Sequence, residues 1–230
     1  MQNLPPAAVY EKEFRYMPWG KLIRKVQEHV VGNVMQRGTL LDMLCGPGYL
    51  LGQLHKQRPD ISYRGVDMEP EFIQHAAGLY PEVKFEIADA FTWDTSDKFD
   101  AVICTAGVHH LPDEQQEQFI AKLASLVSSR GFAIIADPYI GNWNTPEERL
   151  VAAARFGYEY LDATIKSGGT PDVIDAAVQC LRNDVLFIEW KTSARRRLAM
   201  LKPHFKNIHA HKTWPDHETD WGDYCFVVGN

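Results

Sequence analysis

Three aspartates and a glycine-rich turn are the residues whose types and spacing most clearly indicate chemistry in this sequence. Asp42 lies in the apolar run LLDMLCGPGYL, directly before a Gly-Pro-Gly turn. Asp67 closes the run SYRGVD, and Asp89 follows VKFEI. Each acid therefore lies at or near the end of a predicted strand, and the carboxyl ends of parallel strands meet at one edge of a sheet. We expect the three carboxylates to line one crevice beside the glycine turn.

The charge of this crevice discriminates between two cofactors. A dinucleotide such as NAD brings a pyrophosphate, and its site generally holds one acid against the ribose. S-adenosylmethionine has no phosphate and carries a sulfonium, an ammonium and one carboxylate, so three acids suit it better. The spacing agrees, because Gly46, Gly48 and Gly52 miss the G-x-G-x-x-G dinucleotide pattern by one residue. In this interpretation the glycines let the backbone approach the methionine moiety closely.

Two histidines and an acid–tyrosine pair follow later strand-like runs and are expected at the same edge. His109 and His110 come just after FDAVIC, and histidine has a pKa suited to a general base. Asp137 ends the run GFAIIAD, and Tyr139 follows it. Methyl transfer is an in-line displacement in which positioning supplies much of the acceleration, so a base is needed only when the acceptor must lose a proton early. The sequence leaves open whether the histidines act as bases.

Alternating strand-like and helix-like segments must hold these residues in place. Apolar runs predict strands at residues 39–44, 62–67, 83–87, 99–104 and 131–137. The alternation predicts an α/β fold with a doubly wound, mostly parallel, Rossmann-like sheet and helices on both faces. The helix between the last two of these strands is expected to end at Gly131. Two further strand-like runs, FKNIHAHKTW and GDYCFVVG, bring the expected total to about seven strands.

Two helical segments are expected to cover the substrate. Residues 1–36 predict an N-terminal helical lid broken near Pro18, and residues 144–203 predict a helical cap inserted before the last two strands. Both are rich in aromatic residues, which suits a small, flat organic ligand. With the sheet they would form one domain over residues 1–230. The expected substrate-binding residues are Trp19, Asp137, Tyr139 and Trp143.

The ordered motifs LLDMLCGPGYL, GVDMEPEFI, FEIADAF and FDAVICTAGVHHL resemble those of the class I S-adenosylmethionine-dependent methyltransferases, over roughly residues 38–140. The resemblance implies an antiparallel final strand and S-adenosylmethionine as the cofactor. It also implies a role for each matching residue. Asp42 and the Thr105 carbonyl would bind the methionine ammonium, and the backbone of Leu44, Cys45, Gly46 and Gly48 would surround the methionine moiety. Asp67 would bind the ribose, Met68, Asp89 and Ala90 would contact the adenine, and Tyr16 would close over the cofactor. Leu44 departs from the family pattern, which has glycine or another small residue there.

The resemblance implies an enzyme that methylates O, N or C of a small metabolite, such as an aromatic compound of secondary metabolism. His109 and His110 are the candidate catalytic residues because of their position after the fourth strand, where a substrate would approach the methyl group. The alternatives are an NAD(P)-dependent reductase, an S-adenosylmethionine-binding module without turnover, and a methyltransferase acting on tRNA or protein. The reductase is disfavoured, because the required Tyr-x-x-x-Lys spacing occurs only from Tyr80 to Lys84, across Pro81.

Composition narrows the partners and the compartment. The formal net charge of −6 argues against nucleic acid as the main partner. The four cysteines lack paired spacing, and the sequence shows no secretory leader and no apolar run long enough to span a membrane. We therefore expect a cytoplasmic protein with a small-molecule acceptor and with neither membrane nor metal. A homodimer stays open, as does a metal-assisted variant using His109, His110 and Asp137.

Overall fold

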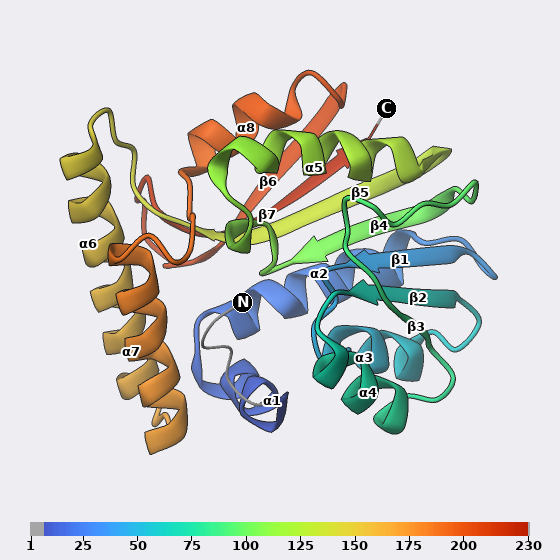
Figure 1. The fold of residues 1–230 in the computed structure, drawn as a ribbon, viewed down its shortest axis with the longest axis horizontal. Helices are drawn as coiled ribbons and strands as arrows, with labels where there is room; N and C mark the ends of the chain where they lie inside the picture. Colours follow the sequence, from blue (N-terminus) through green and yellow to red (C-terminus); the bar gives the residue numbers. More distant parts are fainter. Residues whose placement is uncertain (1–6, 230) are drawn as a thin grey trace.

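The computed structural model describes residues 7–229, built around a seven-stranded sheet (Figure 1). The strands are β1 (Thr39–Met43), β2 (Ser62–Asp67), β3 (Lys84–Ile87), β4 (Phe99–Thr105), β5 (Val127–Tyr139), β6 (Asn207–Trp214) and β7 (Gly222–Gly229). Their order is β3-β2-β1-β4-β5-β7-β6, with β7 antiparallel to both of its neighbours and parallel pairing from β3 to β5. The predicted fold class is therefore confirmed, including the antiparallel final strand.

Helices cover both faces of the sheet because successive strand residues point to opposite sides. On one face, α5 (Asp113–Leu126) and α8 (Ala194–Leu201) pack with Leu41 and Met43 of β1. On the other face, α2 (Trp19–Asn33) and α3 (Tyr49–Gln57) pack with Leu40 of the same strand. A further helix, α4 (Pro70–Leu79), contacts β2 and β3. Two apolar layers thus fix the strand ends on which the site is built.

The strand order reverses between β1 and β4, which places a crevice at their carboxyl ends. Asp42 of β1 lies beside Ile103 of β4, and β2 pairs with β1 on its other side. The chain leaves β1 through the glycine turn into α3, and it leaves β4 into a short 3₁₀ helix, η1 (Val108–His110). The topology therefore brings the acids and the two histidines to one edge.

The end of α5 differs from the sequence-based expectation. The helix ends at Leu126 and β5 begins at Val127, so Gly131 lies within a strand instead of terminating a helix. A Cβ on Gly131 would lie 2.8 Å from the carbonyl oxygens of Phe99 and Asp100, where the pairing of β4 with β5 is irregular. The glycine is needed for this close approach of two strands, which helical spacing alone does not reveal.

The cap and helix α1 of the lid lie side by side, whereas α2 of the lid packs on the sheet (Figure 1). The cap is a helical hairpin of α6 (Pro146–Lys166) and α7 (Pro171–Val185), and α1 (Ala7–Tyr16) contacts α7. The lid helices α1 and α2 are separate on either side of Pro18, and residues 1–6 of the predicted lid lie outside the described residues. The cap is shorter than the predicted 144–203, because α8 packs through Leu201 into the core beside the sheet.

No helix within residues 7–229 is long and apolar enough to cross a membrane.

Candidate functional site

A cavity lies at the carboxyl ends of β1, β2 and β4, where the strand order reverses. It brings together most of the predicted cofactor residues, namely Asp42, Leu44, Cys45, Gly46, Asp67, Met68 and Thr105. Tyr10 and Trp19 of the lid close one side of it, and His110 lies at the end of β4. We name this space the cofactor cavity.

The carboxylate of Asp67 fixes the glycine turn. Its Oδ2 accepts the Gly46 N–H at 2.8 Å and its Oδ1 accepts the Glu69 N–H at 2.9 Å. Burial raises the pKa of Asp67, while these backbone hydrogen bonds oppose the rise. Each carboxylate oxygen retains a second lone pair, so this side chain can organise the loop and accept from a diol at the same time.

The turn holds three residues in the left-handed backbone region: Leu44 with φ 61°, Gly46 with φ 54° and Gly48 with φ 75°. Leu44, the departure from the family pattern, thus adopts a conformation that is costly for a residue with a side chain. A Cβ on Gly48 would lie 2.7 Å from the Phe85 ring, whereas one on Gly46 would meet nothing within 4 Å. The close packing against Phe85 therefore requires glycine at position 48. At position 46, by contrast, there is open space where a side chain would lie.

The chemistry of the cofactor cavity fits S-adenosylmethionine. Asp42 Oδ1 and Thr105 Oγ1 are buried and have no hydrogen-bond partner among the described residues. Burial raises the pKa of Asp42 well above its usual value, and the neighbouring charge of Asp67 raises it further. An ammonium group placed between these oxygens would give both a donor and lower that pKa. The methionine moiety of the cofactor carries such a group.

The predicted adenine contacts lie at the rim of this region. Met68 lines the cofactor cavity with half of its side chain exposed. Asp89 is exposed, and its Oδ1 accepts the Phe91 N–H at 2.7 Å. Ala90 is packed in the core next to it. Neither Asp89 nor Ala90 lines the cofactor cavity, so the roles of these two residues toward adenine stay predictions.

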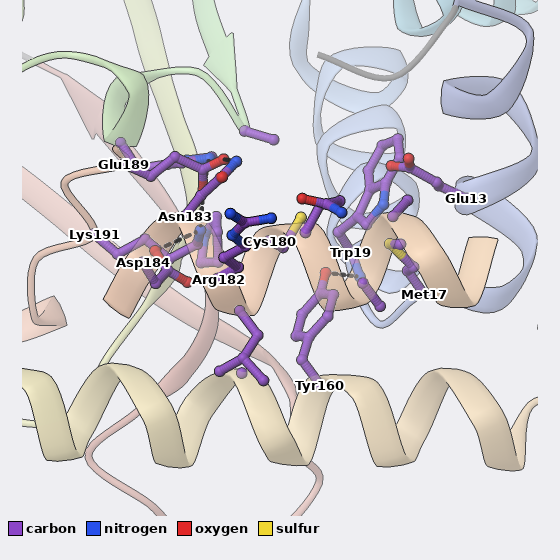
Figure 2. Close-up of a pocket in the computed structure, with 18 of the residues that line it drawn as sticks. Glu13, Met17, Trp19, Tyr160, Cys180, Arg182, Asn183, Asp184, Glu189 and Lys191 are labelled. Carbon is purple, nitrogen blue, oxygen red and sulfur yellow. Dashed lines mark hydrogen bonds and ion pairs between the residues drawn. The ribbon is translucent and has the colours of Figure 1, made fainter. Parts of the chain in front are cut away.

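A second and larger cavity, of about 570 Å³, lies between the lid, the cap and η1 (Figure 2). Its apolar walls include Met17, Trp19, Phe156 and Tyr160, and the Tyr160 hydroxyl accepts the Trp19 N–H at 2.9 Å. We use the name polar wall for one part of its polar lining, made of Glu13, His109, His110, Asn183, Asp184, Glu189 and Lys191; Asp172, Asp175, Gln179 and Arg182 line the cavity as well. We name it the acceptor cavity. It adjoins the cofactor cavity, since Tyr10, Trp19, Ala106 and His110 line both.

His109 and Asp137 form a buried pair at this polar wall. His109 Nδ1 lies 2.7 Å from Asp137 Oδ1, and its Nε2 lies 3.7 Å from Glu189 Oε2. Asp137 does not line the cavity and is only 1 % exposed, so it lies behind the imidazole. Burial, together with the charge of His109, lowers the pKa of His110 to about 3. His110 is therefore neutral at physiological pH.

A buried ion-pair network completes the polar wall. Lys191 Nζ lies 2.9 Å from Asp184 Oδ1 and 2.6 Å from Glu189 Oε2, and Asn183 Nδ2 donates to Glu189 Oε1 at 3.1 Å. Burial disfavours the charge of Lys191, but the two carboxylates raise its pKa above the usual value. Burial likewise disfavours the charge of Glu189, yet Lys191 and the histidines lower its pKa below the usual range.

Four predicted residues have different positions from those expected. Tyr16 lines neither cavity, and its carbonyl oxygen accepts a hydrogen bond from the Ser167 hydroxyl; Tyr10, two turns earlier on α1, lies at the junction instead. Asp137 lies behind His109 and does not line the acceptor cavity. Tyr139 is fully buried in the sheet core.

Trp143 is the fourth predicted residue whose position differs from the expected one. Its ring lies 3.4 Å from the Arg196 guanidinium carbon, a cation–π stack outside both cavities.

The acceptor cavity also uses residues that sequence reasoning missed, namely Tyr10 as a cavity residue, Glu13, Asn183, Asp184, Glu189 and Lys191. The one available signal was the run LFIEWKTS, in which an acid and a lysine alternate with large apolar residues. The charges of Glu189 and Lys191 are nevertheless buried, and buried charges are generally paired.

Comparisons with known proteins agree with this geometry. Residues 40–131 match the model of a family described as a methyltransferase domain. A trans-aconitate 2-methyltransferase of Escherichia coli O7:K1 is 29% identical over 121 residues, which are 53% of this chain and 46% of that protein. The chain thus matches only about half the length of this curated relative.

Solved structures support the fold over most of the chain. A magnesium protoporphyrin IX methyltransferase from Synechocystis PCC 6803, with bound S-adenosylhomocysteine, has a TM-score of 0.62 at 17% identity, covering 93% of this chain and 84% of that one. A TehB-like S-adenosylmethionine-dependent methyltransferase from Corynebacterium glutamicum has a TM-score of 0.59 at 16% identity, covering 91% and 87%.

The fold and the acid-lined cavity, together with the family match, define a Rossmann-like methyltransferase domain. The family model, the curated relative and the fold together support the predicted resemblance to class I S-adenosylmethionine-dependent methyltransferases, and they imply S-adenosylmethionine as the cofactor.

Proposed function

We propose that this chain transfers the methyl group of S-adenosylmethionine to O, N or C of a small organic acceptor bound in the acceptor cavity. The observation that carries the proposal is the junction of the two cavities at Tyr10, Trp19, Ala106 and His110. The cofactor, when bound, supplies an electrophilic methyl group on its sulfonium. The residues at the junction would align an acceptor atom with that group, and alignment is the main source of acceleration in such a displacement.

The shape of the acceptor cavity supports a small and flat acceptor. Its volume of about 570 Å³ lies in the range of small-molecule sites. Trp19, Phe156 and Tyr160 provide aromatic walls on the lid and the cap. A cavity enclosed by these segments suits a metabolite better than tRNA or a protein side chain presented on a large surface.

We assign the general base to His109. With the Nδ1 proton donated to Asp137 Oδ1, at 2.7 Å, Nε2 would be the nitrogen that accepts a proton at the wall of the acceptor cavity, where it lies 3.7 Å from Glu189 Oε2. As an acceptor oxygen or nitrogen bonds to the methyl carbon, its proton would pass to Nε2. His110 is less suited to this role, because burial and the charge of His109 disfavour its protonation. It lies at the junction, where a neutral ring can pack against both ligands.

A metal-assisted reaction is the variant with a structural observation in its favour. Ligand atoms of His109, His110 and Glu189 lie within 4.8 Å of one another. However, Glu189 Oε2 already lies 2.6 Å from the Lys191 ammonium, which a metal ion would have to displace. We therefore propose a reaction without a metal, and methyl transfer that persists in a strong chelator would support this choice.

Thermal unfolding with S-adenosylhomocysteine, and separately with NAD, tests the cofactor side. At 100 times its dissociation constant a ligand stabilises by about 2.7 kcal/mol, a shift of roughly 5 to 11 °C for a domain of this size. A shift with NAD alone would contradict the proposal. Acceptors are then screened by mass gain of one methyl group, with trans-aconitate included. Binding of S-adenosylhomocysteine without transfer to any acceptor would favour a binding module.

A further inference from the structure

The polar wall of the acceptor cavity carries more negative than positive charge. The carboxylates of Glu13, Asp184 and Glu189 are 5 %, 1 % and 7 % exposed, respectively. Lys191, 4 % exposed, is the buried ammonium that faces them within the described lining. Arg182 also lines the cavity but is exposed to solvent, where its charge is screened. Behind the wall, the buried Arg149 guanidinium lies 3.4 Å from the carbonyl oxygens of Asp184, Glu189 and Lys191. Three buried carboxylates are therefore matched by two buried cations, Lys191 and Arg149.

Two buried oxygens in the same wall also lack a donor. Asp184 Oδ2 and Asn183 Oδ1 have no hydrogen-bond partner among residues 7–229. The other atoms of these side chains are used, because Asp184 Oδ1 contacts Lys191 and Asn183 Nδ2 donates to Glu189. An unsatisfied buried acceptor is costly, and native structures contain few of them. Both oxygens belong to residues that line the cavity, so a ligand with N–H groups can reach them.

Glu13 faces this group from the lid, on the opposite side of the cavity (Figure 2). Burial, and then the negative charge of Glu189, raise the pKa of Glu13 to about 8. Carboxylates on both sides of a cavity repel one another unless a cation or a proton lies between them. With Glu13, Asp184 and Glu189 ionised, the three carboxylates exceed the two buried cations, Lys191 and Arg149, by one charge, and a bound monocation would balance it.

We propose that the acceptor carries an amine, bound as an ammonium ion between Glu13 and the Asn183–Asp184 end of α7. Its N–H groups would donate to Asp184 Oδ2 and Asn183 Oδ1, while its apolar body lies against Phe156 and Tyr160. This inference rests on the proposed function and names its substrate class. It distinguishes the chain from enzymes whose acceptors are organic acids, because a carboxylate placed here would lie beside three buried carboxylates.

The test compares small aromatic ligands that differ in one group. The protein is first saturated with S-adenosylhomocysteine, and its further stabilisation is measured with tyramine, 4-ethylphenol and 4-hydroxyphenylacetate. A second set replaces the phenol by an indole, with tryptamine, 3-ethylindole and indole-3-acetate. The amine of each set should bind about tenfold more tightly than its neutral and acidic partners. If neither amine binds more tightly than its neutral and acidic analogues, the inference is overturned.

Glu13→Gln supplies a second, independent readout, because the change is nearly isosteric and Glu13 lines only the acceptor cavity. Affinity for the better amine should fall about tenfold, with affinity for S-adenosylhomocysteine unchanged. The matched control is Glu159→Gln, on the exposed side of α6, which should bind both ligands as the parent does. Equal loss in the two variants, or no loss in Glu13→Gln, contradicts the inference. Failure of the parent to bind S-adenosylhomocysteine would instead refute the proposed function.

Discussion

The two adjoining cavities are built in different ways. The cofactor cavity takes its key groups from the carboxyl ends of β1, β2 and β4 and from the turn after β1, with Asp67 and Gly46 joined by a hydrogen bond of 2.8 Å. The acceptor cavity takes its groups from α1, η1, α7 and the segment after α7. Topology therefore positions the first, whereas side-chain packing between distant segments positions the second. Changes in the first should act on cofactor affinity, and changes in the second on acceptor binding and turnover.

The largest expected effect is on turnover, in His109→Gln. Loss of a general base typically lowers the rate 10²- to 10⁴-fold, so we expect kcat to fall about 10²-fold or more. The dissociation constant of S-adenosylhomocysteine should change less than about twofold, because His109 lines only the acceptor cavity. Steady-state kinetics from pH 5 to 9, on an acceptor found in the screen, would test this. An unchanged kcat would remove the base from the mechanism.

The reciprocal change is Asp67→Ala, which should act on the cofactor. Loss of the Gly46 and Glu69 hydrogen bonds frees the turn, and the affinity for S-adenosylhomocysteine should fall about 10- to 100-fold. The control is Asp97→Ala, whose side chain is 57% exposed and forms a surface ion pair with Arg64. Isothermal titration would measure both. Equal affinities in the two variants would mean that the turn does not depend on the Asp67 carboxylate.

A third change separates charge from shape in the acceptor cavity. Burial and Glu189 raise the folded-state pKa of Glu13 to about 8 from its usual value of 4.5, so the folded protein keeps this proton to a higher pH than the unfolded chain does. Stability should therefore fall as the pH rises from about 4.5 to 8 and then level off. In Glu13→Gln the side chain has no titrating proton, but it keeps the same neighbours, Glu189, Tyr10 and Trp19.

The variant should match the parent near pH 5 and exceed its free energy of unfolding by roughly 2 to 4 kcal/mol at pH 9. Urea denaturation at both pH values would measure this. A difference that does not depend on pH would show that Glu13 titrates normally.

The smallest effect is expected from Tyr139→Phe. This side chain was predicted to bind substrate, but it is fully buried beside Arg197, and its hydroxyl has no hydrogen-bond partner among the described residues. Removing an unpaired hydroxyl should leave kcat/KM within about twofold and stability within about 1 kcal/mol. A large loss of activity would show that Tyr139 reaches the substrate after all.

The same contrast explains how much of the site could be predicted from the sequence. Asp42 and Asp67 follow strands with a clear apolar pattern, so strand position alone places them at the sheet edge. Glu13 and Lys191 carry no comparable signal. An isolated acid on a lid helix generally lies in solvent, and only the packing of α1 against α7 buries Glu13. Tyr139 was misplaced because β5 extends two residues beyond the predicted strand end, so its side chain packs into the sheet core beside Arg197.

The shared wall of the two cavities has a consequence for the order of events in a catalytic cycle. Tyr10 and Trp19 contact both spaces, and Lys12 ties their lid to Asp172 of the cap through an ion pair of 2.8 Å. A displacement of α1 that admits one ligand therefore also opens the wall of the other. The two ligands should not exchange independently of each other.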